Sequence, residues 1–536
     1  MRWWMLLPLL ALGATGGAQP PGSEATSEAP KASPSPHDCG GDTALPAKAA
    51  LLAGYGGGGF AIATSVPKAQ AFFDNGMQLG HAFAHKAAIA AMAESARLDP
   101  ACAMCAWGEA WASGPTINYP VSPDETRKLA IKAEAALRLA ANGPEKERLL
   151  AEALVQRYRK GNEAFAKAMD ALARRYPEDD EILVLAADAW MTFDSNANKT
   201  GNTPREIVLL ETVLRRSPDY TPAIHFYIHA TETAGTSGKA EAYADRLPRL
   251  APAASHLIHM PSHTYYHVGR YQDAVDSNLR AVAIGRENAR RLGLPEPDGI
   301  WDLPYHAHNV QYGVGAALIS GDSGSALALS DPIVARTTKG SANRFGAYGE
   351  MIAGTAYFAE ARFADPAKVL ALPGPSAAFR FATAYWHYAR GEAQARLGRP
   401  ADTRAEAAAM QAPGGHGDKG DSAFDAARKM VSIGRLVLEG RAAMLEKYPK
   451  RAIAAFSAAA KLQESEVFAG FADPPAFWYP VRRDVAAALL AAGRSREAMA
   501  EADAALRAMP REPATLAIRA RISAALARPA QILARR

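Results

Sequence analysis

The chain of 536 residues has little cysteine, little net charge and few long apolar runs. Its three cysteines, Cys39, Cys102 and Cys105, are too few for a disulfide framework. The formal net charge is only +5, and no basic run is interleaved with aromatic residues, so nucleic acid is not an expected partner. The chain has no stretch of about 20 apolar residues, which is the length needed to cross a membrane as a helix. Alanine, which favours helix, is abundant.

The N-terminal region has the pattern of a targeting segment. Residues 1–18 combine one arginine, a short apolar stretch and small residues, as in a secretory signal peptide. Residues 19–37 are rich in Pro, Ser, Ala and Glu, and we expect a disordered linker there. Residues 38–68 include "AGYGGGGF", and we expect an irregular arm leading into the first helix. The sequence thus predicts an exported protein, periplasmic or secreted, that does not span the membrane.

A helical period of about 34 residues organises the remainder of the chain. Segments such as "TVLRRSP" and "DRLPRLAP" end alanine-rich amphipathic patterns with a proline, and Gly-Arg turns precede the next helix. Pro218 and Pro252 lie one period apart, as do Gly235 and Gly269. The pattern resembles the tetratricopeptide repeat (TPR), which implies an all-α superhelical solenoid of helical hairpins. We expect an N-terminal array over 69–330 and a C-terminal TPR-like array over 331–536.

Four histidines follow the same period. His225 opens "HFYIHATE" and His259 opens "HMPSHTYY"; His229 and His263 follow them by four residues, so the two pairs lie 34 residues apart. Residues four apart share one face of a helix, and packed helices lie ~8–10 Å apart, so the four imidazoles can converge in a groove. Glu232 adds a carboxylate three residues after His229.

This set has the donor atoms that a zinc or copper ion needs. The sequence therefore predicts a metal site formed by His225, His229, Glu232, His259 and His263. The alternative is that these histidines hydrogen-bond a carboxylate or peptide ligand directly. Pro261 interrupts the second histidine segment, so that helix is expected to begin near Met260 or to kink there.

Repeat positions predict further residues that face the same groove. Trp107 and Trp111 fall where an aromatic floor for a ligand would lie, although both also suit plain packing. The full set of predicted groove residues is Trp107, Trp111, Asp188, His256, His267, His308 and Gln311.

A second constellation lies near the start of the repeats. "CAMC" places Cys102 and Cys105 on one helical face, and His81 and His85 precede them at a spacing that permits a second metal or redox site. The alternative is a reduced or disulfide-bonded cysteine pair, with His85 packing between helices; one cysteine could also pair with Cys39.

The segments "HAFAHKAA", "LDPACAMCAWGEA" and "HMPSHTYYHVGRYQDA" together resemble a large, mostly bacterial family of exported TPR proteins without a defined activity. Its members commonly have F-N-H where this chain has Phe83-Ala84-His85, and a second histidine where Gln311 stands. The resemblance implies the fold and brings no reaction with it. Three functions follow from the residues: a binding protein whose groove takes a metal ion, small ligand, peptide or protein; a metal-dependent hydrolase or oxidoreductase using the same histidines; or an interaction scaffold of the cell envelope.

Overall fold

A computed structural model describes residues 49–193, 204–339, 346–413, 422–468, 471 and 473–533. The predicted signal peptide, the predicted linker and the first part of the arm, with Cys39, lie outside the described residues. Within those ranges the chain is helical and contains no β-strand, which confirms the all-α prediction. In the same ranges no helix is both long enough and apolar enough for a membrane span.

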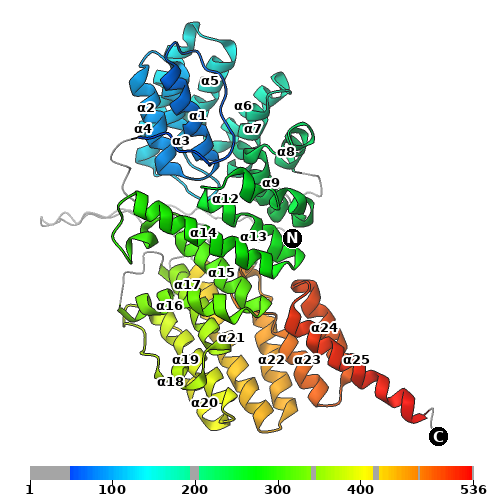
Figure 1. Ribbon diagram of the computed structural model, residues 1–536. Helices are drawn as coiled ribbons and strands as arrows, with labels where there is room; N and C mark the ends of the chain where they lie inside the picture. The colour runs from blue at the N-terminus through cyan, green and yellow to red at the C-terminus, as the bar shows by residue number, and fades with distance from the viewer. Residues whose placement is uncertain are drawn as a thin grey trace, which may run out of the picture. The chain divides into compact units, whose positions relative to one another are not determined.

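Helices follow one another along the chain, and most pack on the helix before and the helix after (Figure 1). The first part comprises α1 (Pro67–His81), α2 (His85–Leu98), α3 (Ala103–Ala112), α4 (Pro123–Leu139), η1 (Ala140–Asn142), α5 (Glu145–Lys160), α6 (Asn162–Arg175), α7 (Asp180–Phe193) and α8 (Arg205–Arg216). The middle part comprises α9 (Thr221–Thr233), η3 (Ser237–Ala240), α10 (Glu241–Ala244), α11 (Leu247–Leu250), α12 (Ser255–His259), α13 (Pro261–Val268), α14 (Tyr271–Arg291), η4 (Gly299–Asp302) and α15 (His306–Ser320).

The C-terminal part continues in the same manner. It comprises α16 (Ser323–Lys339), α17 (Gly346–Phe363), α18 (Pro366–Ala371), α19 (Arg380–Arg396), α20 (Pro400–Ala409), α21 (Ser422–Leu445), α22 (Pro449–Gln463), η5 (Glu466–Phe468), α23 (Arg482–Ala491), α24 (Ser495–Ala508) and α25 (Pro513–Leu533). Small residues between these helices are buried, and one hydrophobic core runs through the packed pairs. The fold is a TPR-type helical solenoid, because each element buries its apolar face on its neighbours in sequence.

The turns are where the repeat pattern placed them. Gly269 and Gly321 end α13 and α15 in the left-handed conformation, and Gly235 has a positive φ just after α9. The predicted break at Pro261 is also present, because α12 ends at His259 and α13 begins at Pro261. The alanine-rich helix expected after Gly235 differs from the prediction. It is divided into η3, α10 and α11, and Pro248, at the start of α11, supplies no N–H to continue α10.

The glycine-rich arm lies against several repeats rather than against the first hairpin alone. The backbone N–H of Gly59 donates to Glu181 on α7, and that of Ala63 donates to Glu147 on α5. Gly56 has a φ of +90°, and a Cβ there would lie 2.5 Å from Thr221 at the start of α9. The arm therefore connects α5, α7 and α9 through contacts that only a glycine-rich backbone can make.

Candidate metal centre

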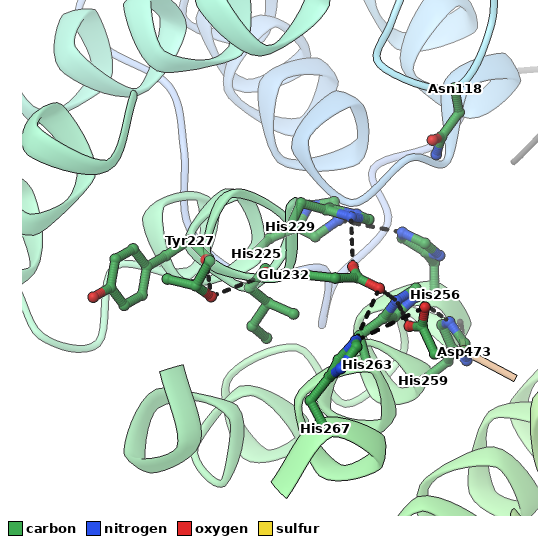
Figure 2. Close-up of polar contacts among 12 residues, drawn as sticks. Asn118, His225, Tyr227, His229, Glu232, His256, His259, His263, His267 and Asp473 are labelled. Carbon is green, nitrogen blue, oxygen red and sulfur yellow. Dashed lines mark hydrogen bonds and ion pairs between the residues drawn. The ribbon is translucent and has the colours of Figure 1, made fainter. Parts of the chain in front are cut away.

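Histidines from consecutive helical segments gather at the junction of α9, α12, α13 and α15 (Figure 2). The repeat explains this gathering, because α9, the α12–α13 pair and α15 are the first helical elements of three consecutive hairpins, and each presents one face to the same place. The histidines are His225 and His229 on α9, His256 and His259 on α12, His263 and His267 on α13, and His308 on α15.

The tightest part of the cluster is a group of three imidazoles, which we call the primary triad: His259, His263 and His308. Nε2 of His259 lies 3.0 Å from Nε2 of His263 and 3.0 Å from Nε2 of His308. All three rings are buried. A tetrahedral zinc ion with Zn–N bonds of ~2.0–2.1 Å holds its nitrogens roughly 3.3 Å apart, so this spacing is close to that of a ligand set.

Hydrogen bonds behind the triad decide which nitrogen of His259 carries the proton. The side-chain amide of Asn278 donates to the carbonyl of Ala274, so its oxygen faces His259 and accepts from Nδ1 at 2.7 Å. Nδ1 of His259 is therefore an N–H, and Nε2 of the neutral ring has a lone pair. A single lone pair cannot accept well from two neighbouring imidazoles at once, whereas a shared cation would be bound by all three nitrogens.

His263 is held from behind by two carboxylates. Its Nδ1 lies 3.0 Å from Glu232 and 2.9 Å from Asp473, and Tyr312 donates a hydrogen bond to Asp473. Figure 2 shows Glu232 between His229 and His263, with Asp473 entering from a C-terminal segment. This pattern, in which a carboxylate accepts from the outer nitrogen while the inner nitrogen faces the centre, is that of metal-ligating histidines.

The charges of these groups depend on one another. Burial alone would lower the pKa of His263, but Glu232 and Asp473 outweigh burial and raise it to about 10. Burial, followed by repulsion from Glu232, raises the pKa of Asp473 to about 7. Burial also acts on Glu232, yet the charge of His263 holds the Glu232 pKa well below its usual range. Without a metal, His263 is thus a cation that compensates the carboxylate.

A second group of three, the secondary triad, adjoins the first: His225, His229 and His256. Nδ1 of His225 lies 2.6 Å from the carbonyl oxygen of His81, which can only accept, so this nitrogen is also an N–H. Nε2 of His225 lies 3.2 Å from Nε2 of His256. Burial lowers the pKa of His225 to about 3 and that of His256 well below its usual value, so both rings are neutral at pH 7.

Two strained aromatic residues contact the ring of His256. Phe83 and Tyr305 both have positive φ values, 55° and 64°, which are uncommon for residues with bulky side chains. Their ring centroids lie 5.0 Å and 4.2 Å from that of His256. The side-chain amide of Asn118 donates to the Tyr305 hydroxyl. Such strain tends to be concentrated at functional sites.

The structure brings His225, His229, His259 and His263 into one cluster, as the repeat period predicted, but divides them between two triads. Two residues expected only to face the groove, His256 and His308, complete those triads. Glu232 is close to His263 and 3.9 Å from both His229 and His267. His267 lies at the edge of the cluster and is about one-third exposed.

Other predicted groove residues lie elsewhere. Trp107 is buried and donates its indole N–H to the carbonyl of Leu150, and Trp111 stacks on it, so these two rings are core rather than a ligand floor. Asp188 accepts from Thr192. Asp188 belongs to no group of metal-ligating side chains in the described part of the chain, and the side-chain oxygen of Gln311 accepts from the hydroxyl of Tyr348.

The proposed second metal site near "CAMC" is not assembled. Cys102 and Cys105 form a disulfide, and disulfide sulfurs are not thiolate ligands. His81 lies 2.5 Å from Glu181, and His85 stacks on Phe83, so the histidines have different partners. The four residues do not form a common ligand group among the described residues.

Sequence reasoning missed several residues that support the centre: Asn278, Tyr305, Tyr312 and Asp473. Tyr312 follows His308 by four residues, so helical spacing could have placed it on the same face. Asn278 is a polar residue on the buried face of the alanine-rich α14. No sequence signal connects Asp473 with histidines more than 200 residues earlier.

No protein-family model matches the chain, and no curated protein matches it. Solved structures that align with it include a chain of the APC/C Cut9–Hcn1 hetero-tetramer, 12% identical over 85% of this chain and 76% of that chain with a TM-score of 0.30. Yeast Tom70 aligns at 10% identity over 86% of this chain and 90% of Tom70, with a TM-score of 0.27. A chain of a human IFIT1 dimer with m7Gppp-AAAA aligns at 10% identity over 72% of this chain and 86% of that chain, with a TM-score of 0.30. Similarities this loose carry no argument about the site or its partners.

Proposed function

We propose that this helical-repeat protein binds a transition-metal ion, zinc or copper, through the primary triad. One observation carries the proposal: the three Nε2 atoms converge, with Nε2 of His259 3.0 Å from each of the other two, while the outer nitrogens of His259 and His263 face Asn278, Glu232 and Asp473. Imidazole is a preferred ligand of zinc, copper, iron and nickel. Convergent imidazole nitrogens with acceptors behind their outer nitrogens are the feature that a metal uses and that ordinary packing does not need.

The secondary triad supports a second ion in the same centre. Ring centroids of His229 and His263 lie 5.5 Å apart, and those of His256 and His259 lie 5.7 Å apart, so the two triads adjoin. Glu232 lies between them and could serve both. We therefore expect a capacity of up to two ions per chain.

Metal analysis of the purified full-length chain tests this proposal. We expect bound zinc or copper in the protein, and at least a hundredfold weaker binding in His259→Ala, because that residue contacts both other members of the primary triad. His387→Ala is the matched control, since His387 pairs with Glu406 on neighbouring helices away from the cluster. Equal metal binding by His259→Ala and the control, in chelator-competition titrations, would contradict the proposal.

A metal-dependent enzyme is the second candidate. A site with three protein nitrogens leaves a position open on a four-coordinate ion, which is the pattern of catalytic rather than structural zinc. Such a position would take water or substrate. Cobalt substitution tests it: azide should change the visible absorption of the cobalt protein if a position is open. A spectrum that azide leaves unchanged would favour a closed binding site.

We also propose that the protein is exported to the periplasm or secreted. The pattern of residues 1–18 supports this, and so does the Cys102–Cys105 disulfide, since disulfides persist in oxidising compartments. Cell fractionation of the full-length chain would test it. A helical-repeat surface is also suited to holding a peptide or protein partner, and crosslinking in cells followed by pull-down tests whether the chain acts as a scaffold.

A further inference from the structure

A pocket of about 300 Å³ lies beside the secondary triad. It is formed by the start of the arm, the α1–α2 turn and the first half of α2, the start of α12, the last part of α14, and the residues at the start of α15. His256 lines it, and Nε2 of the same ring faces His225. Of the secondary triad, only His256 lines the pocket, so its imidazole lies between the pocket and His225.

The lining of the pocket is apolar and cationic. Phe83, Tyr305 and Leu303 contribute apolar surface, Lys86 and Arg291 are its charged members, and none of the described residues that line it is acidic. Arg291 donates to the hydroxyl of Tyr55 and the side-chain oxygen of Asn288, which are neutral. Its positive charge is therefore available to an anion in the pocket.

Three buried ring nitrogens in the lining have no hydrogen-bond partner in the described part of the chain. They are Nε2 of His85, Nδ1 of His256 and Nδ1 of His306, from α2, α12 and α15. Buried polar atoms are normally satisfied, so an unsatisfied set around one cavity indicates where atoms of a ligand or water belong. The three come from separate elements, which makes the pocket a built site.

His256 connects this pocket to the metal centre. If its Nε2 binds a metal, its Nδ1 carries the hydrogen, and metal-bound histidines almost always donate that hydrogen to an acceptor. His259 donates to Asn278 and His225 donates to a backbone carbonyl, but Nδ1 of His256 has no acceptor among the residues that the structure describes. The acceptor has to come from the contents of the pocket.

We propose that the pocket binds a small organic carboxylate with an aromatic or aliphatic body, and that an oxygen of this ligand accepts from Nδ1 of His256. The apolar walls take the body, and Arg291 balances the charge, with Lys86 adding to it. The contact with His256 rests on the proposed metal binding, whereas charge recognition by Arg291 does not. By linkage, the carboxylate and the metal each raise the other's affinity by the same factor.

Calorimetry with 3-phenylpropionate and its neutral amide tests the proposal on the full-length chain, in metal-depleted and zinc-loaded form. We expect the acid to bind at least tenfold more tightly than the amide. Arg291→Gln should lose that preference and Arg291→Lys should keep most of it. Arg290→Gln is the matched control, because Arg290 is exposed and lies 3.9 Å from the exposed Glu296, outside the pocket.

A second variant keeps the test independent of charge changes. Gly285 lines the pocket, and a Cβ there would lie 3.6 Å from Nδ1 of His306, so the side chain of Gly285→Leu should fill the cavity and abolish binding of the acid. Equal affinities for acid and amide, or unchanged binding by Arg291→Gln and Gly285→Leu, would overturn the proposal that the pocket binds a carboxylate. Identical affinity for the acid with and without bound zinc would overturn the contact with His256. If analysis finds neither bound zinc nor bound copper, the proposed metal function fails, whereas the preference for the acid over the amide still tests whether the pocket binds a carboxylate.

Discussion

Asn278 fixes the tautomer of His259, and this gives a sharp prediction for Asn278→Leu. In the wild type, the amide oxygen accepts from Nδ1 of His259 at 2.7 Å, and the amide nitrogen is fixed by the carbonyl of Ala274. Leucine has a similar volume but no acceptor. The hydrogen of His259 can then move to Nε2, where it donates to a neighbouring imidazole and occupies the position that a metal needs.

The size of the effect follows from this change. Loss of an outer hydrogen-bond partner typically weakens metal binding by ~10–100-fold, which is about 1.4–2.8 kcal/mol. The metal-free protein should change less, because a hydrogen on Nε2 of His259 can be donated to Nε2 of His308, 3.0 Å away. The variant therefore separates metal affinity from folding stability.

Chelator-competition titrations, accompanied by thermal unfolding of the metal-free protein, would measure both quantities. Asn278→Asp is the matched variant, since it keeps an acceptor for Nδ1 of His259 and should bind metal within a few-fold of the wild type. In a His259→Ala background, Asn278→Leu should have no further effect on metal affinity. Wild-type affinity in Asn278→Leu, or equal losses in the leucine and aspartate variants, would refute the role assigned to Asn278.

Three further predictions concern other parts of the molecule. Gly56→Ala should lower the thermal midpoint by several degrees, because its φ is +90° and its Cβ would meet Thr221, whereas Gly57→Ala, with 3.7 Å of space, should be tolerated. Burial lowers the pKa of His85 to about 4 in the folded protein. Between pH 6.5 and 4, this imidazole is therefore protonated in the unfolded chain and neutral in the folded one. Stability should then fall by up to about 3 kcal/mol between pH 6.5 and 4, and His85→Gln should reduce that pH dependence. Asp473→Asn should weaken metal binding about tenfold by removing a carboxylate behind the triad, and unchanged affinity would argue against that role.

Local rules account for most of the fold. Glycine turns and proline stops mark hairpin boundaries because they act within a few residues, and the break at Pro261 follows from the missing N–H alone. The segment after Gly235 shows that two local rules can conflict. Its alanine content favours one continuous helix, but Pro248 interrupts it. The arm was harder to predict, because its partners, such as Glu181 and Thr221, lie more than 100 residues away.

In the candidate site, too, the local features could be predicted from the sequence and the long-range contacts could not. His225 and His259 could be placed together because repeats convert a sequence period into spatial proximity. The division into two triads could not be predicted, since it depends on side-chain directions at the α12–α13 break. For Trp107 the sequence left a ligand floor and plain packing open, and the structure supports packing, because its indole is buried against α5.

Asp473 shows why a local solenoid is not sufficient for this centre. Repeats supply imidazoles from neighbouring helices, but the carboxylate behind His263 comes from the segment between α22 and α23. That segment approaches α15 at Gly315, where a Cβ would lie 2.7 Å from Pro474, so a glycine is required on the helix. Because Asp473 binds both His263 and Tyr312, a metal that fixes His263 also fixes this long-range contact. Metal binding should therefore stabilise contacts between repeats that are not neighbours in sequence, and a metal-dependent rise in hydrogen-exchange protection of α15 would reveal it.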